Sequence, residues 1–260
     1  MRYAIYFRYP MIGLLPFFLF WIGISAGTAH GQKLTFEDKK DIALEVTRLF
    51  RASRAVISKS QKLINNPNVG DKGFTAAFVT EKTLENYKNL TGNNVDFANE
   101  KTLKGKVQRG IFESIKEVMD NAQALINQRG LGFKRFLPAI YARQVAESFN
   151  RKRDVKSKAY LKLTAPRSYI RNRSNRPDNW ENDIIEKVFK AADHKKNEPH
   201  IESVPHKGRP AFRFILPEYY KESCLVCHGE PKGGTDFTGG IKEGGKLGGL
   251  GGAISFAIYE

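Results

Sequence analysis

The sequence has few cysteines and few acidic residues, and both shortages limit what the protein can be. Only two of its 260 residues are cysteines, which excludes a scaffold held together by several disulfides. Asp and Glu number 27 against 43 Lys and Arg, so the formal net charge is +16. After residue 26 the chain lacks an apolar run long enough to span a membrane. A basic chain of this kind could meet an acidic protein, an anionic lipid or nucleic acid.

The amino terminus carries the one long apolar run. Arg2 and Arg8 precede an almost uncharged stretch over residues 11–26, and small residues follow it. This pattern is typical of a Sec-type signal peptide, with cleavage expected after Gly31 or, as the second choice, after Ala29. An uncleaved anchor is the alternative, although the run is shorter than the ~20 residues of a spanning helix. We therefore expect an extracytoplasmic or periplasmic protein without a nucleic-acid partner.

The two cysteines are three residues apart and are followed by a histidine, in Cys224-Leu225-Val226-Cys227-His228. C-x-x-C-H is the spacing of a c-type haem attachment site. Each thiol can add across one vinyl group of the porphyrin, and the adjacent histidine then faces the iron as the proximal ligand. The motif predicts one covalent haem c per chain, held by Cys224, Cys227 and His228. An export signal fits this prediction, because haem c is joined to its protein outside the cytoplasm.

Two other chemistries use such a cysteine pair. A thioredoxin-like dithiol would lie at the start of a helix after a strand in a βαβ unit, and no such pattern surrounds Cys224. A zinc site would need two further ligands, conceivably His200 and His206, but the usual second Cys or His pair is missing. Haem attachment is therefore the preferred interpretation.

The ligand on the opposite side of the iron stays unknown at this point. If both cysteines attach haem, the remaining strong ligands are Met119, His194, His200 and His206. Met119 lies in an apolar helical pattern, where methionine more often belongs to the core. Each histidine lies in a polar, Lys-rich stretch typical of the surface. Water, or an open position, is an equal alternative.

The first half of the chain has helical periodicity. Apolar residues recur at helical spacing over 34–66, with Thr35 and Asp38 as a predicted capping pair. Further helices are predicted over 103–127 and from about Phe136 onward.

A faint internal repeat links two of these helix ends. The segments Gln61–Asn65 and Gln123–Asn127 lie 62 residues apart, and each precedes a Gly-Phe pair, at 73–74 and at 132–133. The repeat could be a helix-end device used twice or a coincidence, and two short copies do not establish a solenoid.

After Arg153 the pattern changes to strands and turns. Strand-like segments lie at residues 159–164, 201–204, 210–216 and 253–259. Between residues 229 and 252 lie 11 of the 23 glycines, which predicts a tightly turning loop. Helices followed by an antiparallel sheet indicate the α+β class.

One segment of this loop imitates a nucleotide site. Residues 240–246 match G-x-x-x-x-G-K, but Leu247 stands where a P-loop needs Ser or Thr for Mg²⁺. A strand-like segment also follows where a helix should start. We therefore interpret this segment as a glycine-rich turn.

The basic excess is concentrated in one stretch. Residues 151–176 hold ten Lys or Arg and the single acid Asp154. Most of these side chains are expected to form a solvated basic surface. Some could pair with haem propionates or attract an acidic redox or signalling protein.

Several segments resemble a known family. Residues 171–181 resemble the "RN…N.PD.WE" segment of the Tll-type haem c domain family, whose members carry one haem c on a PAS-like fold. The similarity continues at residues 209–213, 224–231, 240–245 and 252–255, and it covers about Phe133 to Glu260. The resemblance implies thioether attachment at Cys224 and Cys227 and proximal ligation by His228. Family members occur alone after a signal peptide or as extracytoplasmic input domains of kinases and chemotaxis receptors.

The residues of that segment also have a direct interpretation. Pro177 followed by Asp178 predicts a helix start. Trp180 is then expected to cover apolar surface, with contact to the porphyrin edge as the alternative.

Together these features predict a signal peptide over 1–31, a helical region over 32–130 and a PAS-like haem c domain over 131–260. The fold class is α+β, with a PAS-like antiparallel sheet carrying the haem and a long N-terminal helical extension. The expected function is an exported redox- or gas-sensing haem module, and the alternative is a one-electron carrier of the periplasm. An enzyme is not expected, because the sequence names no distal acid–base pair.

Overall fold

The computed structural model describes Met1, Ala4 and residues 33–260. Apart from Met1 and Ala4, the predicted signal peptide over residues 1–31 therefore lies outside the described residues. Thr35–Glu260 belong to one unit. In the described part of the chain, no helix has the length and apolar character needed to cross a membrane.

The first helix begins where the capping pair predicts. In α1 (Phe36–Lys59) the Thr35 side chain accepts a hydrogen bond from the Asp38 amide, and the Asp38 carboxylate accepts one from the Thr35 amide. The helix ends at Ser60, and the short α2 (Gln61–Ile64) follows. The single helix expected over 34–66 is thus interrupted at Ser60, a residue type that competes for backbone hydrogen bonds and favours helix ends.

Three further helices complete the N-terminal half: α3 (Ala76–Thr91), α4 (Leu103–Asn127) and α5 (Pro138–Arg151). The prediction for α4 is confirmed at both ends, and α5 starts with Pro138 in its first turn, two residues after the expected position. The sequence did not reveal α3. Its buried face consists of Ala76, Val79, Thr83 and Tyr87, of which only Val79 is strongly apolar.

The faint repeat corresponds to a helix-end device that the structure uses twice. The Asn65 side-chain oxygen accepts a hydrogen bond from the Lys134 amide at 3.0 Å. The Asn127 side-chain oxygen accepts one from the Lys72 amide at 3.3 Å. Each of these buried lysines also donates from its ammonium to the carbonyl three residues earlier. The two loops therefore brace each other reciprocally, with equivalent residues 62 positions apart.

The second half forms an antiparallel sheet of β1 (Ala159–Thr164), β2 (His200–Ser203), β3 (Ala211–Tyr219) and β4 (Leu250–Tyr259). The strand order is β1-β4-β3-β2. Every predicted strand is present, and β3 and β4 are longer than expected. β3 continues through Pro217 because β2 pairs with it only as far as Ile215, so the missing N–H breaks no ladder on that side.

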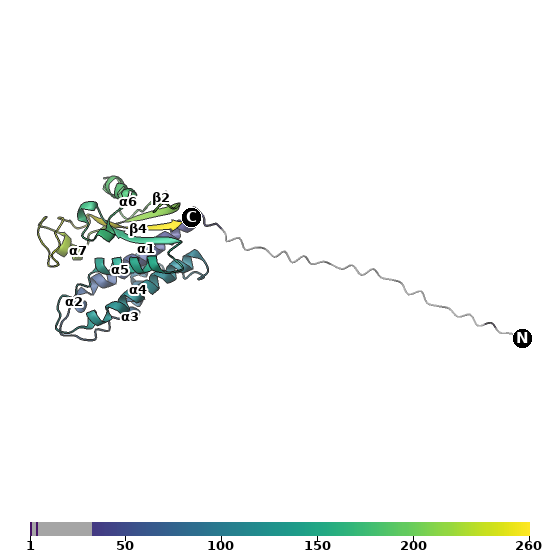
Figure 1. The fold of residues 1–260 in the computed structure, drawn as a ribbon, viewed down its shortest axis with the longest axis horizontal. Coiled ribbons are helices and arrows are strands. Elements are labelled where there is room, and N and C mark those ends of the chain that lie inside the picture. Colours follow the sequence, from purple (N-terminus) through teal and green to yellow (C-terminus); the bar gives the residue numbers. More distant parts are fainter. Residues whose placement is uncertain (2–3, 5–32) are drawn as a thin grey trace. The chain divides into compact units, whose positions relative to one another are not determined.

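The short helical segments of this half are η1 (Arg167–Tyr169), η2 (Arg173–Asn175), α6 (Asn179–Asp183), the π-helical η3 (Ile184–Phe189) and α7 (Glu222–His228). The long helices cover one face of the sheet, and α6 lies over the other (Figure 1). Phe256 of β4 packs against Phe149 of α5 on the first face. Ile215 and Ala253 pack with the η3 residues on the second. The α+β class is confirmed.

The predicted helix start before Trp180 is confirmed as well. The Asp178 side chain accepts from the Glu181 amide and caps α6. The Trp180 indole donates to Glu202 at 2.9 Å, and its ring lies 4.1 Å from the Arg213 guanidinium. Trp180 also packs against the apolar cluster beneath η3, so it joins α6 to the sheet.

Candidate functional site

The C-x-x-C-H motif lies on α7, directly after β3. Cys224 and Cys227 are free thiols and half-buried. Residues three apart lie on the same face of a helix, so one ligand edge can meet both sulfurs. Burial, and then the nearby Asp236 carboxylate, raise the pKa of the Cys227 thiol. Cys227 is therefore held as a thiol rather than as an activated thiolate.

His228 is oriented by a carboxylate from the glycine-rich loop. Its Nδ1 lies 2.5 Å from Oε1 of Glu243, whose side chain is only 7% exposed. The ring stacks on Tyr220 with 5.4 Å between centroids and 25° between planes. A histidine that ligates a metal usually donates its other ring N–H to a carboxylate or carbonyl. The contact with Glu243 leaves Nε2 as the nitrogen available to a metal.

Tyr220 shares the same carboxylate oxygen. Its hydroxyl donates to Oε1 of Glu243. Burial, and then this hydrogen bond, raise the pKa of Tyr220 far above its ordinary value. The phenol therefore keeps its proton and remains a donor.

Arg171 ties the motif to the loop. Its guanidinium donates to the Cys227 carbonyl at 2.7 Å and to the Ile241 carbonyl at 2.9 Å. The same group forms ion pairs with Asp236 at 2.5 Å and with Glu243 at 3.3 Å. One side chain from the segment before α6 thus fixes the C-terminal end of α7, the turn at residue 241 and the carboxylate that orients His228.

Glycines allow the loop to close around these side chains. A Cβ on Gly245 would lie 2.5 Å from Cε2 of Tyr220, and one on Gly251 would lie 2.5 Å from Cε1 of the same ring. The Gly245 amide donates to the His228 carbonyl at 2.6 Å. A Cβ on Gly240 would collide with Arg171. The glycine-rich segment is therefore the tightly turning loop that the sequence predicts, and β4 rather than a helix follows the P-loop-like stretch.

The four candidates for the opposite side of the iron lie elsewhere in the fold. His206 pairs with Arg209 and contacts Tyr259 beyond the first residue of β3, whereas α7 follows the last residue of that strand. Nine strand residues separate these ends by roughly 27 Å. Met119 is fully buried in α4. His200 is bonded to Glu202 beside Trp180, and His194 packs against Phe189.

These positions also bear on the alternative sites. Among the described residues, no group of three or more His, Cys, Asp or Glu side chains is arranged to hold a metal ion. His206 lies at the far end of β3 from Cys224, so the conceivable four-ligand zinc set is not brought together. The helix that carries Cys224 follows the strand β3, which extends the segment predicted at residues 210–216. However, β4 runs antiparallel to β3, so the unit is not the βαβ of a thioredoxin-like dithiol.

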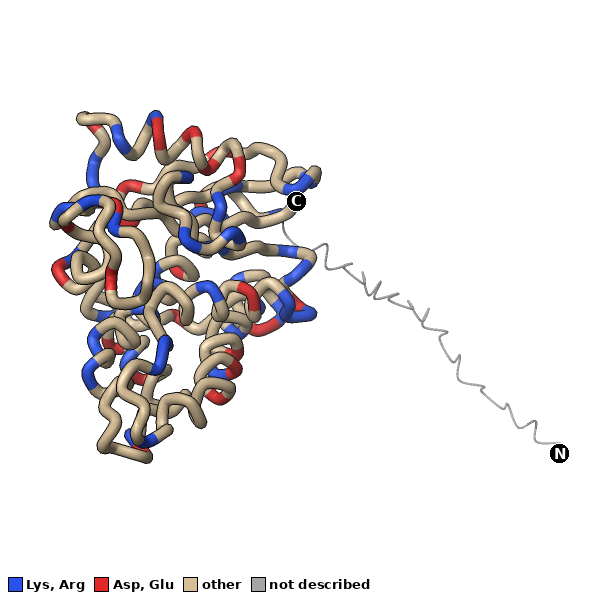
Figure 2. The backbone as a smooth tube through the Cα atoms, turned by 60° about the vertical axis from the view of Figure 1, so that its left-hand side comes forward, with Lys and Arg blue, Asp and Glu red and all other residues tan. Residues whose placement is uncertain are grey.

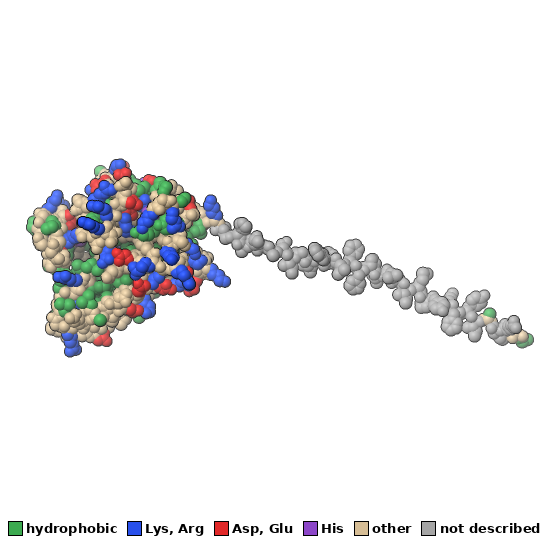
Figure 3. Space-filling model, in the orientation of Figure 1, with side chains coloured by type: hydrophobic (Ala, Val, Ile, Leu, Met, Phe, Trp, Pro, Cys, Tyr) green, Lys and Arg blue, Asp and Glu red, His purple; other side chains and the backbone are tan. Residues whose placement is uncertain are grey.

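Several large apolar side chains near the motif are exposed: Val226, Phe237, Ile241 and Leu247. Phe237 also packs edge-on against Phe133, at 5.1 Å between centroids, which joins the loop to the segment before α5. Figure 3 shows a hollow with hydrophobic side chains around it, on the side where α7 and α2 lie in Figure 1. Apolar side chains around a hollow on this side of the molecule suit a flat apolar ligand.

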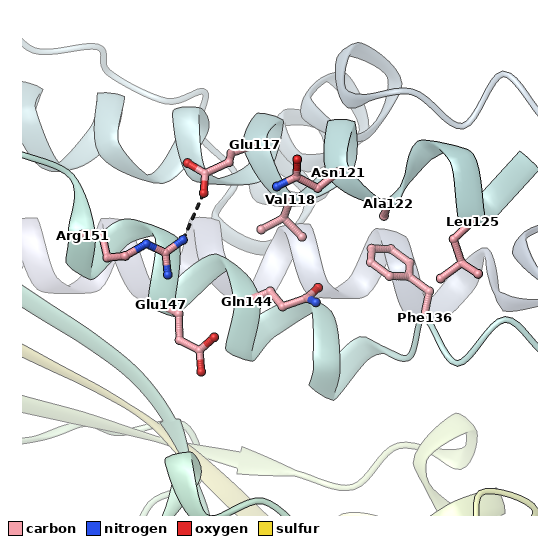
Figure 4. A pocket seen from close by; sticks show the side chains of 9 residues that line it. All are labelled: Glu117, Val118, Asn121, Ala122, Leu125, Phe136, Gln144, Glu147 and Arg151. Atoms are coloured by element: carbon pink, nitrogen blue, oxygen red, sulfur yellow. Dashed lines mark hydrogen bonds and ion pairs between the residues drawn. The ribbon is translucent and has the colours of Figure 1, made fainter.

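Two open grooves lie away from this site. The one in Figure 4 has a volume of about 310 Å³ and runs between α4 and α5, where Arg151 pairs with Glu117 at 3.1 Å. The other, of about 390 Å³, lies beside Lys187 and His194. Their linings lack the convergent arrangement of polar groups seen around His228.

The basic residues of the described chain are not gathered in one patch. Lys and Arg lie over the sheet half and the helical half and are interspersed with acids (Figure 2). Within residues 151–176, Lys152 pairs with Glu117 and Lys162 with the buried Glu181. Part of the excess is thus used inside the fold rather than at its surface.

The family model described as Tll0287-like matches residues 36–258. The chain belongs to the Tll0287-like family. The match extends over the helices α1–α5, well beyond the segment from Phe133 onward in which the sequence resemblance is specific. No curated protein and no solved structure matches the chain in the comparisons made.

The C-x-x-C-H spacing predicted three site residues but not the residues that position them. The structure brings Cys224, Cys227 and His228 together on α7, as the motif requires. Tyr220 and Glu243 were not predicted as site residues, and Arg171 appeared only as part of a matching segment. The cluster of glycines at residues 239–252 was the signal that could have revealed them. A glycine leaves room for a neighbouring side chain, so the cluster predicts that larger side chains pack closely against this loop.

Proposed function

We propose that the protein is an exported single-haem c-type protein that senses redox state or a small gaseous ligand. The observation that carries the proposal is the contact of His228 Nδ1 with Glu243, on a helix that also presents both thiols. That arrangement leaves Nε2 for iron and two S–H groups for the vinyl carbons. The S–H bond of each cysteine would add across one vinyl group, which forms a thioether without an oxidant.

The residues of the site have distinct tasks in this proposal. Cys224 and Cys227 hold the cofactor covalently, and His228 supplies the proximal nitrogen. Arg171 and Glu243 fix the orientation of that nitrogen. When bound, the haem would supply an iron that changes charge by one electron or accepts a diatomic ligand. We further propose that the sheet is PAS-like and carries the haem. We also propose that the signal peptide is cleaved and that the protein is extracytoplasmic.

A sensing role is supported by the positions of the distal candidates. Met119 is buried in α4, and His194, His200 and His206 each contact a residue outside α7. A sixth position without a side-chain ligand would admit a small molecule. An enzyme is not proposed, because a distal acid–base pair has not been identified.

The alternative role, a one-electron carrier, is supported by the net charge of +16, which would attract an acidic redox partner. Carbon monoxide separates the two roles. A sensor of gases should bind it in the ferrous state with a clear change in the Soret band. A carrier with a strong sixth ligand should not respond.

The attachment itself is tested by expression with a haem c maturation system. We expect haem staining to persist through denaturing electrophoresis. Cys224→Ser and Cys227→Ser should each leave one thioether, and the double variant should lose the stain. Ser223→Ala, next to Cys224, is the matched control and should keep it. A pyridine haemochrome of the non-covalent type in the wild-type protein would refute the attachment.

A further inference from the structure

We infer that Glu243 is a positioning residue that, through His228, stabilises the ferric over the ferrous state of the bound haem. The inference rests on the proposed haem attachment and goes beyond it, because it assigns the setting of the reduction potential to one carboxylate. Glu243 lies fifteen residues after His228 and outside the attachment motif.

The first argument is the strength of the contact. His228 Nδ1 and Glu243 Oε1 are in close contact at 2.5 Å, and hydrogen bonds in which one partner is ionised are shorter and stronger than neutral ones. The Glu243 side chain is 7% exposed, so water competes little for its oxygens. A carboxylate that accepts a hydrogen bond from the Nδ1–H group increases electron density on the imidazole and makes Nε2 a more basic ligand. A more basic ligand stabilises the higher charge of ferric iron.

The second argument is that the carboxylate is held from several sides. Arg171 binds Oε2 at 3.3 Å, and Tyr220 donates to Oε1. The neighbouring backbone is fixed by the hydrogen bond from the Gly245 amide to the His228 carbonyl. A carboxylate held in this way needs no reorganisation when the iron changes charge, which is what a potential-setting group requires.

Tyr220 gives the inference a second, opposite prediction. Its hydroxyl and His228 compete for the same oxygen of Glu243. Removal of the hydroxyl leaves that oxygen a stronger acceptor for the imidazole. Tyr220→Phe should therefore favour ferric iron more strongly, whereas Glu243→Gln should favour ferrous iron. A general loosening of the site would move both variants in the same direction.

The experiment is a spectroelectrochemical titration of the haem-loaded protein and its variants. At the wild-type midpoint, Glu243→Gln should lower the ferric-to-ferrous ratio at least tenfold, which corresponds to a rise of 59 mV for a one-electron couple. Tyr220→Phe should raise that ratio. Glu243→Asp should restore part of the wild-type potential, because it returns the carboxylate. The control is Glu222→Gln, which removes an exposed charge on the first turn of α7 and should change the ratio less than threefold.

Two results would overturn the inference: equal shifts for Glu243→Gln and Glu222→Gln, or shifts of one sign for Glu243→Gln and Tyr220→Phe. If Glu243→Gln does not fold, the Asp and Phe variants decide. The ferric-to-ferrous ratio of Glu243→Asp would then have to be lower than that of the wild type. Haem staining of the denatured wild-type protein distinguishes failure of the proposed function from failure of this inference. Without stain, the proposed function fails. With stain but without the shifts in potential, only the role of Glu243 fails.

Discussion

Arg171 and Asp236 form an ion pair of 2.5 Å that joins the segment before α6 to the glycine-rich loop. The Asp236 side chain is fully buried, whereas that of Arg171 is 31% exposed. Burial alone would raise the pKa of Asp236, but hydrogen bonds from Thr238 and Arg171 outweigh it and hold the pKa well below its usual range. Asp236 is therefore ionised in the folded protein and depends on its donors.

Removal of the arginine should destabilise the fold by way of this loop. Arg171→Ala removes the ionic partner of the buried Asp236 carboxylate, which keeps the hydrogen bonds from the Thr238 and Gly240 amides. We expect a loss of about 2–3 kcal/mol in the free energy of unfolding, below the cost for a fully buried pair because Arg171 is partly exposed. Urea unfolding measures it. The control is Arg173→Ala, an exposed arginine without an ion pair among residues 33–260, expected within about 0.5 kcal/mol of wild type. Equal stability of the two variants would show that the pair contributes nothing.

His206 should make stability depend on pH. It is 4% exposed, contacts the Tyr259 hydroxyl at 2.9 Å and packs at a tilt against the Tyr160 ring, with 4.8 Å between centroids. Burial, and then the nearby Arg213, lower its pKa to about 4. The unfolded chain, with a pKa near 6.5, then binds more protons between about pH 4 and 6.5. The free energy of unfolding should rise with pH across that window, by at most about 1.4 kcal/mol per unit from this group, and fall as the pH decreases through it.

The test is urea unfolding of His206→Gln between pH 4 and 7. The variant should lose this part of the slope, whatever its stability at pH 7. Tyr259→Phe removes the hydrogen bond but keeps the titrating ring, so its slope should persist. An unchanged slope in His206→Gln would contradict the assignment.

Trp180 should matter for stability and not for the cofactor. Its ring packs on the cluster under η3 and on Arg213, both on the face of the sheet opposite the long helices. Trp180→Ala should cost about 2 kcal/mol, less than for a fully buried tryptophan because the ring is half-buried. The absorption spectrum of the haem-loaded protein should stay as in wild type, and Trp180→Phe should recover part of the stability. A changed spectrum at unchanged stability would instead support contact with the porphyrin edge.

The sequence predicted the elements whose buried faces are strongly apolar. The helix at Leu103–Asn127 and the strand at Ala159–Thr164 have the expected bounds because their apolar residues follow one period throughout. The helix α3 was not predicted because its buried face includes Thr83 and Tyr87. These residue types are not apolar enough to indicate a core-facing side in the sequence. The end of β3 was not predicted because Pro217 suggests a strand boundary. Whether a proline is tolerated there depends on how far β2 pairs with β3, which the sequence does not show.

The site, too, has residues that the sequence predicts and residues that it does not. Local spacing was sufficient for Cys224, Cys227 and His228, because all three lie within one short helix. Glu243 and Arg171 reach His228 and Cys227 from 15 and 56 residues away. Contacts at such separations depend on how the loop closes, which no local pattern records.

The closure of that loop can be tested at Gly245. A Cβ there would lie 2.5 Å from Tyr220 and 2.9 Å from the His228 carbonyl oxygen. Since the latter is backbone, Gly245→Ala can be accommodated only if the loop moves away from α7, at a cost of about 1–3 kcal/mol. Gly132→Ala is the matched control, because its Cβ would meet nothing within 4 Å and should leave stability unchanged or slightly higher. Thermal unfolding compares them, and chemical modification with diethyl pyrocarbonate reports the access to His228. In Gly245→Ala the modification should be faster, because Glu243 is withdrawn along with the loop. Equal modification rates in the two variants would mean that the position of the loop over His228 does not require a glycine at residue 245.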